Sequence, residues 1–317
     1  MRQLGPLHRG PRRSCPGLHV RRHRGPAPAE LSSRPEQLGR VQRGCGPTVI
    51  SGRAENPPSG GLVPVPVRGN LLSTSPAVLR HSAVELVLTF LLLLSVTTVV
   101  RWVIGSPAVS SAIPEVRLQL LAVGAIVGIL ITGLVLSPLG RQSGAHMNPA
   151  ISFAMWRLGL LPGAAVVPYT VAQLSGSLLG VFAARGIWGR STSAPPVTYA
   201  ALQPGPGWSA AELFAAETLS TGVIVLLVAV FTSVRRLTRH TPYMVGTVVC
   251  LTITLLGNST GGSTNPARQF GPALASGQYS FLWVYLLAPV PGAALGVLAR
   301  NLLLKRTART PAAGVPT

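Results

Sequence analysis

The amino-acid sequence contains one short segment twice, and this repeat constrains the fold more than any other feature. Residues 143–153 read SGAHMNPAISF, and residues 260–270 read TGGSTNPARQF, 117 positions later. A second match at an offset of 116 relates Gly176 and Gly180 to Gly292 and Gly296. Two nearly equal offsets in unlike segments are hard to obtain by chance. We therefore predict that the chain is built from two related halves.

Six apolar segments accompany the repeat, each near the roughly 20 residues that cross the hydrocarbon core of a bilayer. Charged residues make up only 11% of the chain, whereas soluble domains carry about 25%. The sequence therefore predicts an all-α membrane protein with six transmembrane helices. They are expected at about residues 82–104, 118–137, 163–185, 209–232, 242–257 and 281–303, the fifth being short.

An odd number of spans in each half turns the second half upside down in the membrane, so we predict an inverted three-span repeat. The two Asn-Pro-Ala segments then approach from opposite faces. Each opens a short apolar stretch, residues 149–157 and 266–274, which predicts a re-entrant half-helix rather than a span. Proline suits the first helical position, and Asn is a favoured residue just before it.

Two half-helices of this kind would bring two helix N-termini together inside the membrane. Each N-terminus carries roughly half a positive charge, which opposes the passage of cations and protons. Capped asparagine amides would offer hydrogen-bond donors in fixed directions to water or a hydroxyl group. The predicted pore motifs are Asn148, Pro149, Ala150, Asn265, Pro266 and Ala267.

Three further residues are predicted to support these loops. Glu85 and Glu217 lie inside apolar segments, where a charge is costly. Each is therefore expected to accept hydrogen bonds from backbone N–H groups of a re-entrant loop. His146 stands two residues before Asn148 and is expected to bond within its loop, with gating as an alternative role. The paired glycines of the second match are expected to let helices pack closely.

These motifs resemble those of the major intrinsic protein family, the aquaporins and aquaglyceroporins, over about residues 80–303. The resemblance implies the family's fold, a homotetramer with one pore in each subunit, and a constriction made by four residues outside the paired asparagines. Arg268 and the loop residue Gly262 follow directly from the second motif. Counting from the motifs assigns Ile253 in the fifth span and Gly128 in the second.

This predicted constriction differs from the pattern of water-selective members, which have an aromatic residue in the second span and His in the fifth. Two glycines and an isoleucine would leave a wider, less polar opening, which favours glycerol-like solutes or uncharged metalloid acids alongside water. Gln269 and Ala273 favour water instead, since glycerol channels carry Asp at the first of these positions. Our prediction is a solute-permissive pore.

The predicted function is a passive channel for water and small uncharged solutes such as glycerol, which excludes protons and ions. The alternative is an inverted-repeat secondary transporter of a small neutral solute, although the chain contains no Asp for ion coupling. An enzyme is not expected, because no nucleophile–base pair, metal-ligand spacing or phosphate loop stands out. No cofactor or metal is expected either.

Residues 1–78 are predicted to be a disordered basic leader, followed by a channel domain over 79–305 and a short cytoplasmic tail over 306–317. The leader is rich in Arg, Pro, Gly and Ser and lacks an apolar period. It is interpreted as a tail near anionic lipid, as the product of a start site placed too far upstream, or as a nucleic-acid-binding arm, the least favoured of the three. Nucleic acid is not an expected partner; the lipid bilayer is.

The distribution of basic residues predicts the orientation of the chain. With the N-terminus inside, ten basic residues lie in cytoplasmic segments and four, Arg101, Arg117, Arg185 and Arg190, lie outside. This asymmetry fits the positive-inside rule. We therefore expect a multi-pass protein of the cell membrane with both termini in the cytoplasm.

Overall fold

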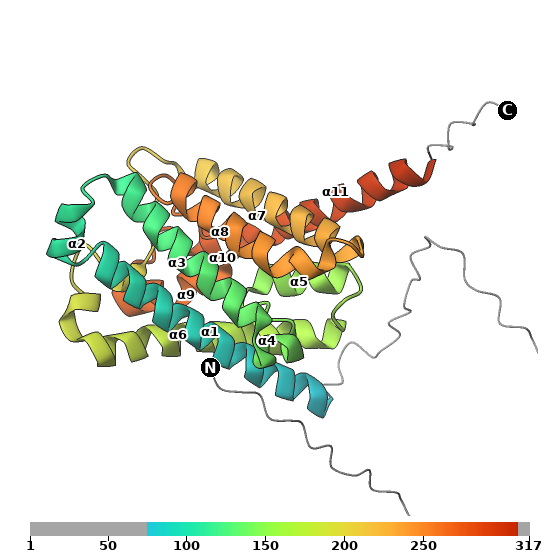
Figure 1. Cartoon of the computed structure of the whole chain (residues 1–317), viewed down its shortest axis with the longest axis horizontal. Coiled ribbons are helices and arrows are strands. Elements are labelled where there is room, and N and C mark those ends of the chain that lie inside the picture. Colours follow the sequence, from blue (N-terminus) through green and yellow to red (C-terminus); the bar gives the residue numbers. More distant parts are fainter. Residues whose placement is uncertain (1–74, 310–317) are drawn as a thin grey trace, which may run out of the picture. The chain divides into compact units, whose positions relative to one another are not determined.

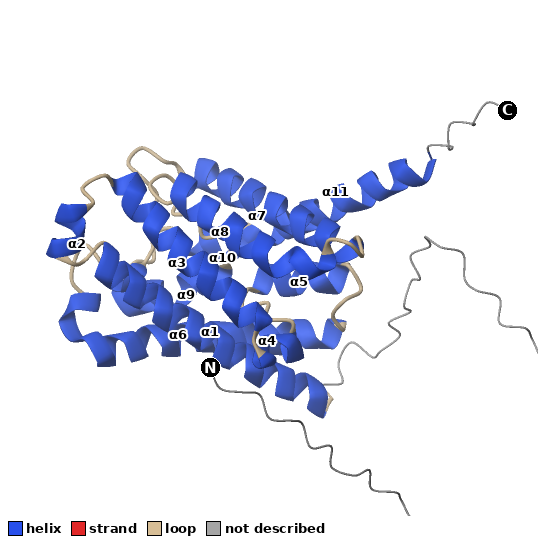
Figure 2. Cartoon of the chain, viewed as in Figure 1, coloured by secondary structure: helices blue, strands red, loops and turns tan. Residues whose placement is uncertain are grey.

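The protein is represented by a computed structural model that describes residues 75–309, and every regular element in this range is a helix (Figures 1 and 2). The predicted leader lies outside the described residues except for 75–78, and residues 310–317 of the predicted tail also lie outside them. The elements are α1 (Pro76–Val103), α2 (Pro107–Ala112), α3 (Val116–Leu136), α4 (Pro138–Ser143), α5 (Pro149–Arg157), α6 (Gly163–Trp188), η1 (Gly189–Thr192), η2 (Thr198–Ala200), α7 (Ala210–Ser233), η3 (Thr238–His240), α8 (Thr241–Leu256), α9 (Pro266–Ser276), α10 (Leu282–Leu287) and α11 (Pro289–Arg309).

Five helical segments of the described chain are long and apolar enough to cross a membrane. They are formed by α1, α3, α6 with η1, α7, and α10 with α11. The short fifth segment predicted from the sequence corresponds to α8, an apolar helix of 16 residues. Large apolar side chains point outward: Ile129, Val167 and Leu255 are 74%, 70% and 72% exposed. Such a surface suits a lipid environment.

The long helices pair in the same way in both halves. Helix α1 packs along α6, and α7 packs along α11, while α3 packs along α8 and joins the halves. Gly176 and Gly180 permit the first contact, because a Cβ on either would overlap backbone atoms of α1. Gly292 and Gly296 play the same part against α7. The predicted role of these glycines in close packing is confirmed.

The predicted half-helices correspond to α5 and α9, of nine and eleven residues. In Figure 1, α5 lies toward the right-hand end of the helices and α9 toward the left. Helix α9 ends at Ser276 and is capped by Gly277, whose φ of 75° is left-handed, a conformation that glycine adopts without steric cost. Two short helices from opposite ends therefore enter the bundle between the long ones.

Candidate functional site

The two half-helices begin with the same hydrogen bond. The Asn148 side-chain oxygen accepts from the Ala150 N–H at 2.9 Å, and that of Asn265 accepts from the Ala267 N–H, also at 2.9 Å. A proline stands at the start of each helix, where its missing N–H has no intrahelical partner to lose. The predicted cap geometry is confirmed at both motifs.

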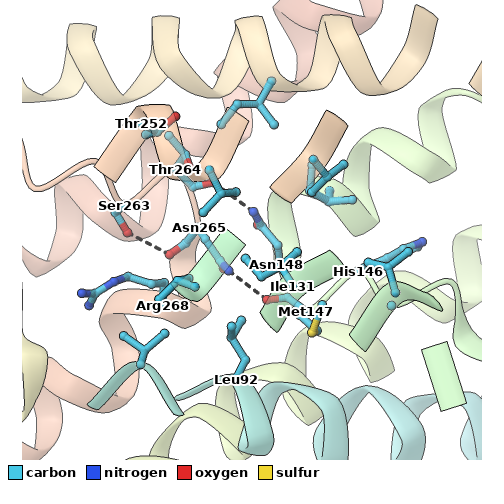
Figure 3. Close-up of a pocket in the computed structure, with 18 of the residues that line it drawn as sticks. Leu92, Ile131, His146, Met147, Asn148, Thr252, Ser263, Thr264, Asn265 and Arg268 are labelled. Carbon is cyan, nitrogen blue, oxygen red and sulfur yellow. Dashed lines mark hydrogen bonds between the residues drawn. The ribbon is translucent and has the colours of Figure 1, made fainter. Parts of the chain in front are cut away.

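Each asparagine also bonds across to the other loop (Figure 3). Asn148 Nδ2 donates to the Thr264 carbonyl at 3.0 Å, and Asn265 Nδ2 donates to the Met147 carbonyl at 2.9 Å. A carboxamide has two N–H groups, so each Asn keeps a second donor, and both residues line the same cavity. The two helix N-termini and these donors therefore lie at the same part of the cavity wall.

The residues just before the asparagines adopt a left-handed backbone. Met147 and Thr264 have φ values of 47° and 46°, a conformation that costs a non-glycine residue about 1–2 kcal/mol. Contacts from elsewhere in the chain must therefore hold both turns.

Two buried glutamates supply those contacts. Glu85 of α1 accepts from the N–H groups of His146 at 3.0 Å and Met147 at 2.7 Å. Glu217 of α7 accepts from the corresponding N–H groups in the second loop, Ser263 at 3.1 Å and Thr264 at 2.7 Å. Both side chains are fully buried. The hydrogen bonds predicted for Glu85 and Glu217 are therefore present.

His146 lies beside the first of these turns. Its Nδ1 is 3.1 Å from the Ser152 hydroxyl, and its ring lies 5.5 Å from that of Tyr169, centroid to centroid. The residue also lines the cavity. His146 thus forms a side-chain hydrogen bond as predicted, but its partner Ser152 lies in α5 rather than in the loop; gating stays a hypothesis.

Arg268 follows the second motif and reaches a different loop. Its Nη1 donates to the Ala200 carbonyl at 2.7 Å, and the residue lines the cavity near Asn265 (Figure 3). One of its five N–H groups is used in this bond. The guanidinium therefore carries further donors at the wall of the cavity.

A single cavity of about 850 Å³ connects these groups. At one end it is lined by Ser75 and His81, and at the other by Val197 and Leu202. Between them its wall is mostly aliphatic, with the two asparagines and Arg268 as the polar groups of the re-entrant helices. Other polar side chains, such as Tyr169, Thr232 and Thr252, also line this largely apolar passage. Apolar wall residues include Leu92, Val96, Val123, Val127, Ile131, Val249 and Ile253.

Three of the four residues predicted for the constriction line this cavity. The prediction for the fourth, Gly128, must be corrected. Ile253, Gly262 and Arg268 are lining residues. Gly128 faces α8 instead, because a Cβ there would overlap the carbonyl oxygen of Gly246. Its neighbour Val127 points into the cavity. The contribution of α3 to the cavity wall therefore comes from a valine side chain rather than from a glycine.

Residues 72–300 match the family model described as the major intrinsic protein family. The chain belongs to this family. Its aquaporin-like fold agrees with the solved structure of the aquaglyceroporin from Plasmodium falciparum, with a TM-score of 0.61 over 73% of this chain and 98% of that one. The sequence identity to that protein is 21%, so this likeness concerns the fold.

Relatives in the family include proteins from plants, from an archaeon and from mouse. The chain is 30% identical to the Arabidopsis thaliana protein "Probable aquaporin NIP7-1" over 75% of this chain and 82% of that protein. It is 37% identical to "Probable aquaporin AqpM" of Archaeoglobus fulgidus over 58% and 76%. For "Aquaporin NIP3-1" of Oryza sativa the identity is 36%, and the chain spans about half of that relative, 54%.

Membership in the major intrinsic protein family makes the chain a multi-pass membrane protein. The family is one of channels rather than enzymes. These findings support the predicted class, a passive channel for water and small uncharged solutes, over the transporter alternative.

Two supporting tyrosines were missed by the sequence analysis. Tyr169 donates to the Ser143 carbonyl at 3.0 Å, and Tyr285 donates to the Thr260 carbonyl at 2.7 Å. The tyrosines are 116 positions apart, the offset of the paired glycines, and this match would have revealed them. Ser177, which bonds to α9, has an alanine at the equivalent position and left no repeat signal.

Proposed function

We propose that the protein is a passive channel that conducts water and small uncharged solutes such as glycerol, and excludes ions and protons. The observation that carries the proposal is the single cavity lined by Asn148, Asn265 and Arg268 together. Its largely aliphatic wall offers few hydrogen bonds, and the side chains of Asn148, Asn265 and Arg268 present N–H donors to it. Such a path replaces part of the hydration shell of a neutral solute, while an ion loses more than it gains.

The paired half-helices account for the exclusion of protons and cations. Two helix N-termini meet where the asparagine side chains cross-bond, and both present positive helix ends. A water molecule there accepts hydrogen bonds from the free N–H groups of Asn148 and Asn265. Holding its oxygen in this way interrupts a continuous chain of waters, and Arg268 adds a fixed positive charge nearby.

The constriction is assigned to Arg268, Gly262, Ile253 and, in place of Gly128, Val127. Gly262 contributes no side chain, and its φ of 60° with Thr252 close by disfavours replacement by any other residue. Two aliphatic side chains and one guanidinium around the same cavity give an amphipathic lining. This favours solutes with hydroxyl groups along one edge, such as glycerol or uncharged metalloid acids, besides water.

We further propose a homotetramer in the cell membrane with both termini in the cytoplasm. Exposed apolar side chains of α3 and α8, such as Ile129 and Leu255, provide surface for contact with neighbouring subunits and lipid. Basic residues concentrate at one predicted face, which the positive-inside rule places in the cytoplasm. Accessibility of a terminal tag in sealed cells and the mass of the solubilised protein test these two statements.

The proposed transport is tested by stopped-flow light scattering on proteoliposomes that contain the full chain. We expect osmotic water flux well above that of empty liposomes, together with glycerol flux that rises linearly with concentration. Neither flux should depend on an ion gradient or raise proton permeability. Saturable flux that requires an ion gradient would favour the transporter alternative, and water flux without glycerol flux would reject the solute-permissive constriction.

A further inference from the structure

We infer that Gln269 is a positioning residue that holds the loop of residues 198–202 over the constriction, and thereby fixes the guanidinium of Arg268. This inference rests on the proposed function. Gln269 is 1% exposed and follows Arg268 in α9, so the two side chains leave the helix in different directions. One lines the cavity, and the other binds backbone.

The side-chain amide of Gln269 forms hydrogen bonds with both backbone groups of Leu202. Its Oε1 accepts from the Leu202 N–H at 2.9 Å, and its Nε2 donates to the Leu202 carbonyl at 2.9 Å. A carboxamide presents one donor and one acceptor side by side, as a backbone strand does. An aliphatic side chain at position 269 would lose both bonds.

The loop needs such support because its backbone is unfavourable. Thr198, Tyr199 and Ala200 have φ values of 42°, 57° and 59°, and none of them is a glycine. Consecutive left-handed residues persist only where the surrounding structure holds them. Leu202 lies two residues beyond Ala200, so the Gln269 bonds hold the chain next to this strained segment.

The same loop segment positions Arg268. The Ala200 carbonyl accepts from Arg268 Nη1 at 2.7 Å. Arg268 and Gln269, which are adjacent in α9, therefore bind Ala200 and Leu202 of the same loop. The loop is therefore clamped at two points by adjacent side chains of one helix. If Leu202 is released, the Ala200 carbonyl moves and the guanidinium loses its fixed direction, so the constriction discriminates less by solute size.

The test compares the permeability of a four-carbon polyol, erythritol, with that of glycerol in proteoliposomes of the full chain. In Gln269→Leu, the loss of two hydrogen bonds should let the loop leave its native conformation more often. We expect the ratio of erythritol permeability to glycerol permeability to rise about threefold. Gln269→Glu keeps the acceptor for the Leu202 N–H and should give a smaller rise. It also serves as the second variant if Gln269→Leu does not fold.

Two controls separate positioning from a general structural role. Gln278→Leu removes an exposed hydrogen bond from Gln203, the residue that follows this loop, and should leave the ratio unchanged. In an Arg268→Ala background, Gln269→Leu should add nothing to the ratio, because its effect passes through the guanidinium. Hydrogen exchange of the Leu202 amide should accelerate in Gln269→Leu.

An unchanged ratio in folded Gln269→Leu, or an equal rise in the Arg268→Ala background, would overturn the inference. A native chain that passes neither water nor glycerol would instead refute the proposed function. The two failures are therefore distinguishable in one set of measurements.

Discussion

Half-helices α5 and α9 begin with the same cap and the same glutamate-held turn, but different groups hold the rest of each helix. On α9, the Ser177 hydroxyl of α6 donates to the Ala267 carbonyl and accepts from the Gly271 N–H at 3.0 Å. Those two backbone groups are four residues apart and would pair in an uninterrupted helix. A side chain of a long helix therefore bridges a carbonyl and an N–H group that lie one turn apart on α9.

Helix α5 is held by apolar contact at the equivalent place. Ala154 and Ala293 stand at the positions that correspond to Gly271 and Ser177, and they belong to one buried apolar cluster. Glu85 also accepts from the Ser143 hydroxyl at 2.6 Å and from Gln173 Nε2 at 2.8 Å. Glu217 has a matching bond from Thr260, but Pro289 stands at the position of Gln173.

The cavity-facing side chains diverge as well. Ile151 of α5 occupies the position equivalent to Arg268 of α9, and both line the cavity. The duplicated halves thus keep the backbone bonds that bring two N-termini together. They differ in the side chains that meet a solute and in the way each short helix is held.

The largest expected difference between the halves concerns the glutamates. Replacing either with Gln leaves at least one buried N–H without an acceptor, at a cost of about 1–3 kcal/mol for each such group. Because Glu85 also accepts from Gln173, whose equivalent in the second half is Pro289, Glu85→Gln should lower the unfolding temperature of the solubilised protein more than Glu217→Gln. Glu212→Gln, at the exposed start of α7, is the control and should have little effect. Equal losses in the two halves would mean that the extra donor at Glu85, Gln173, adds no stability.

A second prediction concerns the contact between α3 and α8, which joins the halves. Val127→Phe adds a ring at the cavity wall, and we expect the glycerol-to-water permeability ratio to fall about tenfold, in the range that steric discrimination allows. Gly128→Ala adds a methyl group against Gly246, so it should lower the unfolding temperature and leave the ratio unchanged. A changed ratio in Gly128→Ala, with none in Val127→Phe, would restore the assignment made from the sequence.

Most of the shared frame was predictable from the sequence because its chemistry is local or duplicated. The Asn caps and their prolines are adjacent in the chain, and the glutamates recur in both halves. The assignment of Gly128 was wrong because it was counted from Asn148 across α4 and its flanking turns, whose length local sequence does not fix. A shift of one residue turns a helical side chain by about 100°, which exchanges a cavity residue for a packing residue.

The contacts that differ between the halves gave no comparable signal. Arg268 meets the Ala200 carbonyl, 68 residues away, and Gln269 meets Leu202, 67 residues away. Backbone groups of an irregular loop accept these bonds, so no side-chain pattern marks them. Ser177 was likewise hidden, since its effect depends on the close approach of α6 to α9.

Arg268 and Ile151 provide the third prediction. Arg268→Ala removes a fixed charge and a large side chain from the constriction, so glycerol permeability should rise about fivefold relative to water, as a modest change in barrier allows. Ile151→Ala widens the cavity at the equivalent position of the first half, where no constriction is assigned, and should leave the ratio within about twofold. Stopped-flow measurements on matched proteoliposomes compare the two. A larger effect of Ile151→Ala would place the narrowest point in the first half.

The smallest expected effect concerns Ser177 and Ala293. In Ser177→Ala, the Gly271 N–H and the Ala267 carbonyl can pair with each other, so the loss of stability should be only about 0.5–1 kcal/mol. Ala293→Ser places a hydroxyl against α5, where it can bond to a carbonyl of its own helix, and little change is expected. Thermal unfolding of the two solubilised variants measures both effects. The glycerol-to-water ratio should not change in either, because Ser177 supports α9 from outside the cavity. A changed ratio in Ser177→Ala would mean that this hydroxyl shapes the constriction through α9. The contacts that hold the two short helices would then contribute to selectivity, in addition to the side chain of Arg268.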